Sequence, residues 1–290
     1  MTRDARIGTI IAGLLCAAGL ATAPGAFAQG SVERGAYLVN AVMACDTCHT
    51  PRGPNGGLDM TRRLSGGSQI FETPAYLVKG ANITPDRETG IGAWSDADLK
   101  RTLTTGVRPD GSRLATAMPF AFYGGMTPGD LDSIVAFLRS LPPVNNKVQA
   151  PVYRLNTVVH AVPGTERPTD ERDLADPVKR GAYLATLAHC QECHAGHVGD
   201  TPDFRGAPGK GGRVFSGPAG SVAAVNITSS KTAGIGDWTD EDIKRVLTTS
   251  KGRDGRQLAG PMARGAYFKN MTPGDMDALI AYLRRLPPLD

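Results

Sequence analysis

Cys45-Asp46-Thr47-Cys48-His49 is the stretch on which the fold of this 290-residue chain depends, and it returns as Cys190-Gln191-Glu192-Cys193-His194. Cys-x-x-Cys-His is the attachment pattern of c-type haem. Two thiols three residues apart lie on the same side of a helical turn, so both can bond to one porphyrin. The histidine that follows can then coordinate the iron. Each stretch therefore predicts two covalent anchors, at Cys45 and Cys48 or at Cys190 and Cys193, and one axial ligand, His49 or His194.

Zinc sites and thioredoxin-like redox pairs also contain Cys-x-x-Cys. A zinc site of that type needs two more ligands nearby, and neither half of the chain has a spare cysteine to supply them. The chain has five cysteines, of which the two stretches use four and Cys16 lies in the N-terminal leader. Haem is therefore the favoured interpretation, and no structural disulfide is predicted.

Residues 1–28 are typical of a secretory signal. Arg3 and Arg6 give it a positive start, residues 7–20 form an apolar stretch, and Ala26-Phe27-Ala28 predicts cleavage before Gln29. The alternative is an uncleaved anchor, for which the apolar run is short. No later run approaches the roughly 18 apolar residues of a membrane span, so a soluble mature protein is expected. Export also suits the haem motifs, because bacteria attach haem covalently outside the cytoplasm.

The mature chain repeats itself with an offset of 144 to 146 residues. The period is too long for a solenoid and predicts two copies of one domain. We expect domains at residues 29–143 and 177–290, each of a size that holds one core, with a Pro-rich linker at 144–176. The matched segments are Arg34–Leu38 with Arg180–Leu184, Asn82–Thr84 with Asn226–Thr228, Gly90–Asp96 with Gly234–Asp240, and Met126–Asp130 with Met271–Asp275.

Three helices are predicted in each copy. The first spans about residues 32–44 and leads into the haem motif. The second begins after the N-cap Ser95 and ends at Gly106, and the last begins after the N-cap Thr127 with Pro128 in its first turn. High glycine (36) and proline (21) contents predict long ordered loops between short helices. Gly35 and its repeat counterpart are expected to let the first and last helices cross closely.

The second axial ligand is predicted to be a methionine that recurs in both copies, because a thioether raises the reduction potential of haem. Met118 and Met262 meet this condition, each on a Gly/Pro-marked loop before the last helix. Met126 and Met271 are the rivals, but their position before a Thr cap suits a hydrophobic staple. The alternative histidine ligands, His160, His189 and His197, are interpreted as surface or supporting residues.

The residues quoted above resemble those of the bacterial multi-haem c-type cytochromes that serve membrane-bound periplasmic dehydrogenases, above all the cytochrome subunits of the alcohol dehydrogenase type. The likeness rests on Cys-x-x-Cys-His, on Asn82 to Asp96, on the Ala-Met-Pro-Phe loop at 117–120 and on Leu-Arg-Ser-Leu-Pro-Pro at 138–143. It implies an all-α fold of two tandem class I cytochrome c domains, with short helices and long loops around one covalent haem each. Many members of that family have a third haem domain and a C-terminal membrane-binding tail, whereas this sequence has two copies and ends at Asp290.

The resemblance implies a dihaem electron carrier in the periplasm, with two covalently bound haem c groups and no catalytic residues of its own. A periplasmic dehydrogenase would donate the electrons, and a terminal oxidase or another cytochrome would accept them. Peripheral association with the inner membrane is compatible with this function. The formal charge of +4 gives no indication of nucleic-acid binding. The alternative is a dihaem redox enzyme of the peroxidase or thiosulfate dehydrogenase type, which would need one open or differently ligated iron.

Overall fold

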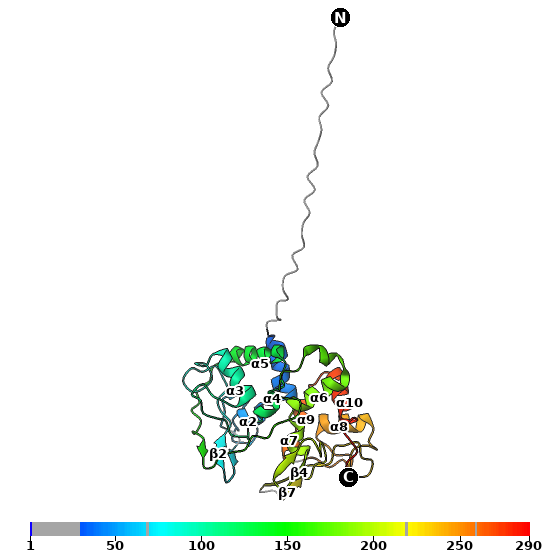
Figure 1. Cartoon of the computed structure of the whole chain (residues 1–290). Coiled ribbons are helices and arrows are strands. Elements are labelled where there is room, and N and C mark those ends of the chain that lie inside the picture. The colour runs from blue at the N-terminus through cyan, green and yellow to red at the C-terminus, as the bar shows by residue number, and fades with distance from the viewer. Residues whose placement is uncertain (2–29, 68–69, 218–219, 259) are drawn as a thin grey trace.

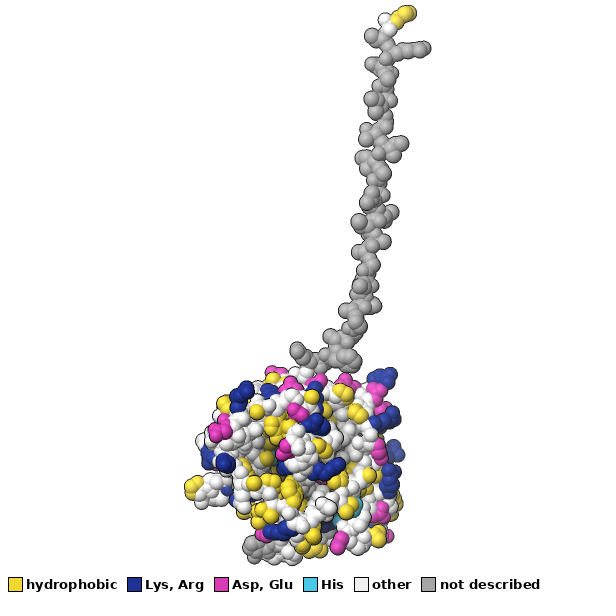
Figure 2. Space-filling model, turned by 60° about the vertical axis from the view of Figure 1, so that its left-hand side comes forward, with side chains coloured by type: hydrophobic (Ala, Val, Ile, Leu, Met, Phe, Trp, Pro, Cys, Tyr) yellow, Lys and Arg dark blue, Asp and Glu magenta, His cyan; other side chains and the backbone are white. Residues whose placement is uncertain are grey.

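The computed structural model describes Met1 and residues 30–67, 70–217, 220–258 and 260–290. Apart from Met1, the predicted signal segment lies outside the described residues. The rest of the chain forms two repeat-related halves that lie side by side (Figure 1). On the face seen in Figure 2, basic and acidic side chains are interspersed, and hydrophobic side chains reach the surface among them.

The first half contains two long helices and a set of short elements around them. In chain order these are α1 (Val32–Tyr37), the π-helical turn η1 (Leu38–Val42), α2 (Asp46–His49), η2 (Met60–Arg62), β1 (Ile70–Glu72), β2 (Tyr76–Lys79), α3 (Asp96–Thr105), α4 (Phe120–Tyr123) and α5 (Pro128–Ser140). The connecting segment carries β3 (Val152–Tyr153) and η3 (Glu171–Ala175). Because β3 pairs with β2, this segment runs along the first half before it reaches the second.

The second half repeats the helices of the first in the same order. Its elements are α6 (Pro177–Leu187), α7 (Cys190–His194), β4 (Gly196–Val198), β5 (Thr201–Asp203), β6 (Val214–Gly217), β7 (Gly220–Ala223), α8 (Asp240–Thr249), η4 (Gly260–Met262), α9 (Gly265–Phe268) and α10 (Pro273–Leu283). The short helices α4 and α9, which follow the two predicted methionine loops, were not expected from the sequence.

The predicted helix caps are confirmed. Ser95 caps α3 and exchanges hydrogen bonds with Asp98 in a capping box, and Gly106 ends the helix in a left-handed conformation with φ of 70°. Thr239 and Asp242 form the same box at α8. The Thr127 side chain accepts a hydrogen bond from the amide of Asp130 at the start of α5. The sequence predicts these caps because each cap residue forms its hydrogen bonds with backbone groups in its own helical turn.

The predicted close crossing of the first and last helices is also confirmed in both halves. A Cβ atom at Gly35 would lie 1.9 Å from the carbonyl oxygen of Ser133 in α5. A Cβ atom at Gly181 would lie 1.9 Å from the carbonyl oxygen of Ala278 in α10. Only a residue without a side chain permits this approach, so the two crossings are fixed by the two glycines.

The predicted all-α fold is wrong. Helices make up 36% of the structure and strands 11%. Among the described residues, the strands form three small antiparallel sheets, in the orders β1-β2-β3, β4-β5 and β6-β7. Short runs of β-branched and aromatic residues, such as Phe71 opposite Val78 and Phe215 opposite Val222, form these hairpins within segments interpreted as loops. Strands of two to four residues are too short for alternation to reveal them in the sequence.

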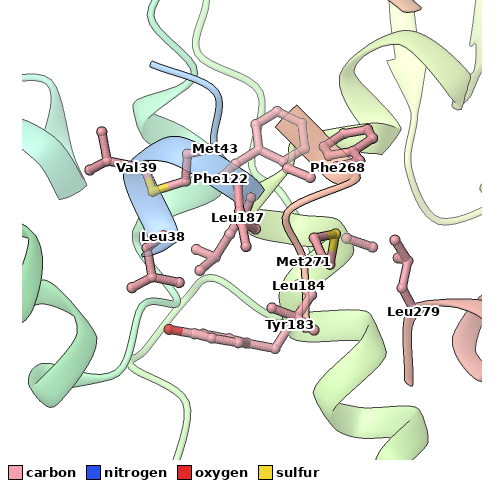
Figure 3. Packing of buried hydrophobic residues seen from close by; sticks show 14 of the residues in the cluster. Leu38, Val39, Met43, Phe122, Tyr183, Leu184, Leu187, Phe268, Met271 and Leu279 are labelled. Atoms are coloured by element: carbon pink, nitrogen blue, oxygen red, sulfur yellow. The ribbon is translucent and has the colours of Figure 1, made fainter. Parts of the chain in front are cut away.

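A hydrophobic core continues from one half into the other. Figure 3 shows Leu38, Met43 and Phe122 of the first half gathered with side chains of the second half. The turn η1 contacts α9, and α4 contacts α6. The helix that precedes each haem motif therefore packs against the short helix that follows the methionine loop of the other half.

Candidate haem-binding sites

Each Cys-x-x-Cys-His stretch begins directly after a residue in the left-handed region. Ala44 has φ of 55° and His189 has φ of 47°. This conformation is unfavourable for residues other than glycine, so the surrounding structure must hold it. It ends the preceding helix and starts the short helix α2 or α7, which carries the motif. The repeat therefore preserves an unusual backbone turn as well as the cysteine spacing.

The two motif histidines have the same hydrogen bond. Nδ1 of His49 lies 2.8 Å from the carbonyl oxygen of Ala81, and Nδ1 of His194 lies 2.8 Å from that of Val225. A carbonyl oxygen can only accept, so Nδ1 carries the proton and Nε2 keeps its lone pair. Burial lowers the pKa of both imidazoles, which keeps them neutral. Each ring is thus held in the tautomer that can coordinate iron through Nε2.

The Asn-Ile-Thr segments hold the backbone that supplies these carbonyl groups. The Asn82 side chain donates to the carbonyl of Val144 at 2.8 Å and accepts from the amide of Thr84 at 3.0 Å. Asn226 donates in the same way to the carbonyl of Leu289 at 2.6 Å. The repeat makes this segment recognisable in the sequence but does not indicate its role, because the carbonyl that orients the histidine comes from the residue before the segment and has no side-chain signature.

A continuous cavity of about 1740 Å³ extends over both halves. Cys45, Cys48, His49 and Met118 line it in the first half, and Cys193 lines it in the second. The cavity exceeds the roughly 300–1,000 Å³ of an ordinary small-molecule site. In the first half the structure brings both predicted anchors and both predicted axial ligands to one hollow, as a haem requires.

The second half matches this arrangement less fully. Cys190 and Met262 are partly buried against the core, and the cavity reaches Gly260 at the start of the predicted methionine loop. Within the described part of the chain, neither Met262 nor His194 lines the cavity. The loop differs in sequence as well, because Ala263 stands where the first half has Pro119 and one more residue follows. The rival methionines, Met126 and Met271, are buried core residues, in agreement with a packing role.

The residues inside the two motifs also differ. Asp46 is buried and pairs with Arg63, whose Nε lies 2.9 Å and 3.0 Å from the two carboxylate oxygens. The equivalent Gln191 is neutral, and its side-chain oxygen accepts a hydrogen bond from the amide of Gly209 at 2.9 Å. The first motif thus contains a buried ion pair where the second contains a neutral side chain that accepts a hydrogen bond.

A second asymmetry lies at His189, which stands where the first half has Ala44. Nδ1 of His189 lies 2.8 Å from a carboxylate oxygen of Glu192, and Nε2 lies 3.2 Å from the guanidinium of Arg264. Phe122 of the first half meets the ring edge-on at 6.4 Å. His189 is therefore a buried supporting residue at the junction of the halves. His197 also lines the cavity, and its buried Nδ1 has no hydrogen-bond partner among the described residues.

The motif cysteines are half-buried thiols. Burial raises the pKa of Cys45 to about 12 and that of Cys190 and Cys193 to about 11. Reactive redox cysteines have lowered pKa values instead. Within the described ranges, no group of three or more His, Cys, Asp or Glu side chains is gathered as a metal site. Thiols with raised pKa values fit covalent anchoring groups and differ from reactive redox cysteines.

Comparison with known proteins supports this interpretation. Residues 178–287 match the cytochrome c family model. The chain is 30% identical to a diheme cytochrome c-type protein of Cereibacter sphaeroides, over 85% of this chain and 83% of that one. It is 32% identical to the fructose dehydrogenase cytochrome subunit of Gluconobacter japonicus, over 91% of this chain but 54% of that protein. The cytochrome c subunit of the quinone alcohol dehydrogenase of Gluconobacter oxydans is 26% identical, over 89% and 55%.

The fold and the paired motifs define a protein that binds haem covalently and transfers electrons. The chain belongs to the c-type cytochromes, and the predicted resemblance to dehydrogenase cytochrome subunits is confirmed. It spans about half the length of the fructose and alcohol dehydrogenase subunits that it matches. The family model matches one domain, in the second half, so two tandem class I domains are not what the comparison finds.

Proposed function

We propose that this cytochrome carries two haem c groups, one in each half. Cys45 and Cys48 would anchor the first, with His49 and Met118 as axial ligands. Cys190, Cys193, His194 and Met262 would do the same for the second. The observation that carries this proposal is the identical Nδ1-to-carbonyl hydrogen bond of the two motif histidines. The likeness to a diheme relative and a cavity larger than one site support the count of two.

The haem supplies one-electron redox chemistry when bound, and the residues of the chain around it set its reduction potential. Met118 would raise the reduction potential as a thioether ligand, and the carbonyl of Ala81 would fix the opposite ligand. The apolar side chains around the cavity exclude water, which also favours the less charged, reduced form. No acid, base or nucleophile is needed for this function, so we propose no catalytic residue.

We propose that the electron donor is a dehydrogenase and that the acceptor is a terminal oxidase or another cytochrome. The names of the relatives support the donor, because they are cytochrome subunits of fructose, alcohol and gluconate dehydrogenases. Since the chain covers only about half of those proteins, the substrate of its own partner does not follow from the likeness. A complex with a dehydrogenase would be detected by co-purification and by reduction of the haem on addition of the substrate.

We propose a periplasmic location, reached through a cleaved signal at residues 1–28. Covalent haem attachment outside the cytoplasm supports this location. No helix within the described residues is long and apolar enough to cross a membrane. N-terminal sequencing of the mature protein should begin at Gln29.

The test of the proposed function is the absorption spectrum of the purified holoprotein, oxidised and reduced, with and without carbon monoxide. The weak sulfur-to-iron band of the oxidised form counts methionine-ligated haems against total haem. If the band accounts for two haems and carbon monoxide changes nothing, both irons are closed and the chain is an electron relay. A haem that lacks the band or binds the gas has an open or differently ligated iron.

One observation favours the second candidate function, a dihaem redox enzyme of the peroxidase or thiosulfate dehydrogenase type. Met262 does not line the cavity, so the second iron is the one on which an open position would occur. The same spectrum separates the two functions, because only the enzyme would bind carbon monoxide at the second haem. In the enzyme, Met262→Ala would also leave the sulfur-to-iron band unchanged, since no bond between Met262 and iron would exist to remove.

A further inference from the structure

Two tyrosine hydroxyl groups, one from each half, form hydrogen bonds across the junction between the halves. The Tyr37 hydroxyl of the first half donates to a carboxylate oxygen of Asp275 in the second half at 2.5 Å. The Tyr183 hydroxyl of the second half donates to Asp130 of the first half at 2.8 Å. These pairs occupy equivalent positions of the repeat.

Each hydroxyl also accepts a hydrogen bond from the backbone of the other half. The amide of Thr272 donates to the Tyr37 oxygen at 3.3 Å, and the amide of Thr127 donates to the Tyr183 oxygen at 3.2 Å. Thr127 and Thr272 are the N-caps of α5 and α10. Each tyrosine therefore binds both the cap residue and the first-turn carboxylate of the last helix of the other half.

The carboxylates that receive the hydroxyls are held firmly. Asp130 is 7% exposed and Asp275 is 1% exposed. The Arg34 guanidinium donates to the two oxygens of Asp130 at 2.7 Å and 2.9 Å, and Arg180 pairs with Asp275. Burial raises the pKa of Tyr37 to about 12, so its hydroxyl keeps the proton that it donates. A buried, ion-paired carboxylate is a strong and fixed acceptor.

The helix that each tyrosine binds, α5 or α10, begins a few residues after the predicted methionine loop of the same half. Met118 leads directly into α4, with the amide of Phe120 donating to the Met118 carbonyl at 2.8 Å, and α5 begins soon after. In the second half, the amide of Arg264 donates to the Met262 carbonyl at 2.7 Å, and α9 and α10 follow. The α4 and α9 helices pack on α6 and η1 of the opposite half. Figure 3 shows Phe122 of α4 and Phe268 of α9 within this shared core.

We propose that each half positions the axial methionine loop of the other half, through Tyr183 for Met118 and through Tyr37 for Met262. The proposal rests on the ligand assignment given under the proposed function. Tyr37 and Tyr183 are positioning residues, because neither is a ligand itself.

The physical reason for a crossed effect is that the two sides of each haem are held differently. On the histidine side, two thioether bonds and a buried ring fix the group. On the methionine side, one dative bond comes from a loop whose place depends on α4 or α9. Loss of a tyrosine hydrogen bond would therefore weaken the bond between methionine and iron before it affected the histidine side. That methionine belongs to the half opposite the altered tyrosine.

The experiment compares Tyr37→Phe and Tyr183→Phe in the full-length holoprotein. Phenylalanine keeps the ring packing and removes only the hydroxyl. The readout is the pair of ring-current-shifted methionine methyl signals in the NMR spectrum of the reduced protein, assigned with Met118→Ala and Met262→Ala. Carbon monoxide binding and the two midpoint potentials are measured on the same samples. Ser140→Ala is the control, since it also removes a hydroxyl, and that hydroxyl donates to the carbonyl of Phe137 within α5 at 2.8 Å.

In Tyr37→Phe we expect the Met262 signal to shift or broaden, with carbon monoxide reaching that haem roughly tenfold more often, while the Met118 signal is unchanged. Tyr183→Phe should give the opposite pattern, and Ser140→Ala should give neither. An effect on the haem of the same half, or on neither haem, would overturn the proposal. If Met118→Ala and Met262→Ala remove no methyl signal, the ligand assignment itself has failed, which is a separate result.

Discussion

The two halves of this cytochrome share one scaffold but surround their motifs with different chemistry. Both halves have the left-handed turn before the motif, the histidine-to-carbonyl hydrogen bond and the glycine crossing. Only the first has the buried Asp46–Arg63 pair, and only the second has a histidine, His189, between Glu192 and Arg264. The repeat thus preserves the groups that we propose to hold haem and varies the charged residues around the motifs, so two haems bound as proposed are expected to differ in reduction potential.

The largest expected effect tests whether both halves hold a haem at all. Cys45→Ser with Cys48→Ser should remove one haem, and Cys190→Ser with Cys193→Ser should remove the other, because each pair supplies both thioether anchors. The haem-to-protein ratio, measured by the pyridine haemochrome assay, should fall from two to one in each case. A ratio that one pair leaves unchanged would confine haem binding to a single half.

The next effect compares the two methionines. Met118→Ala should lower the potential of the first haem by on the order of 0.1 V, within the roughly 0.8 V that axial ligands span, and should open its iron to carbon monoxide. Met262→Ala should do the same at the second haem. Redox titration with carbon monoxide spectra measures both. An unchanged spectrum in either variant would mean that this methionine is not an axial ligand. The two halves would then differ in how they bind the iron.

A smaller effect concerns the residue after the first motif cysteine. Asp46→Ala leaves the Arg63 charge without its partner in a largely buried position and should cost about 3 kcal/mol of unfolding free energy. The matched variant Gln191→Ala loses one neutral hydrogen bond and should cost about 1 kcal/mol. Urea unfolding of the two holoprotein variants measures the difference. Equal losses would mean that the ion pair adds nothing beyond a hydrogen bond.

The smallest effect is the pH dependence that His189 adds to the stability of the second half. Burial lowers the pKa of His189, even though Glu192 favours its charged form, and Arg264 lowers it further. As the pH falls below about 6.5, the unfolded chain binds a proton that the folded chain resists, so stability should fall by at most about 1.4 kcal/mol per pH unit. His189→Gln should flatten this slope between about pH 7 and 5, whereas Ala44→Gln in the first half should leave it unchanged. If stability depends on pH as steeply in His189→Gln as in the unaltered protein, another titratable group causes the dependence.

Local signals in the sequence predicted the parts of the fold that depend on local physics. The Ser95 and Thr127 caps and the Gly35 crossing were predicted correctly, since each acts through a small set of backbone atoms. The hairpins were missed because strands of two to four residues carry almost no periodic signal. The binding candidates were predicted from the motif, and the structure gathers Cys45, Cys48, His49 and Met118 around one cavity.

Other features of the sites depend on contacts between distant segments and could not be predicted. Nothing in the local sequence of Tyr37 indicates a partner 238 residues away. Ala81 and Val225 act through their backbone carbonyl groups, which any residue could provide. Arg264 meets His189 across 75 positions of the chain. In each case tertiary packing brings together groups that no local sequence pattern connects.

The exchange of tyrosines between the halves has the symmetry of a homodimer. In an isologous contact, residue i of one subunit touches residue j of the other, and j touches i in return. Tyr37 with Asp275 and Tyr183 with Asp130 satisfy that rule inside a single polypeptide. Such a contact is closed by the two halves themselves, since each half supplies both a tyrosine and a carboxylate. The two halves are related as the subunits of a two-fold dimer are, but each can change in sequence without a change in the other, as Asp46 and Gln191 show.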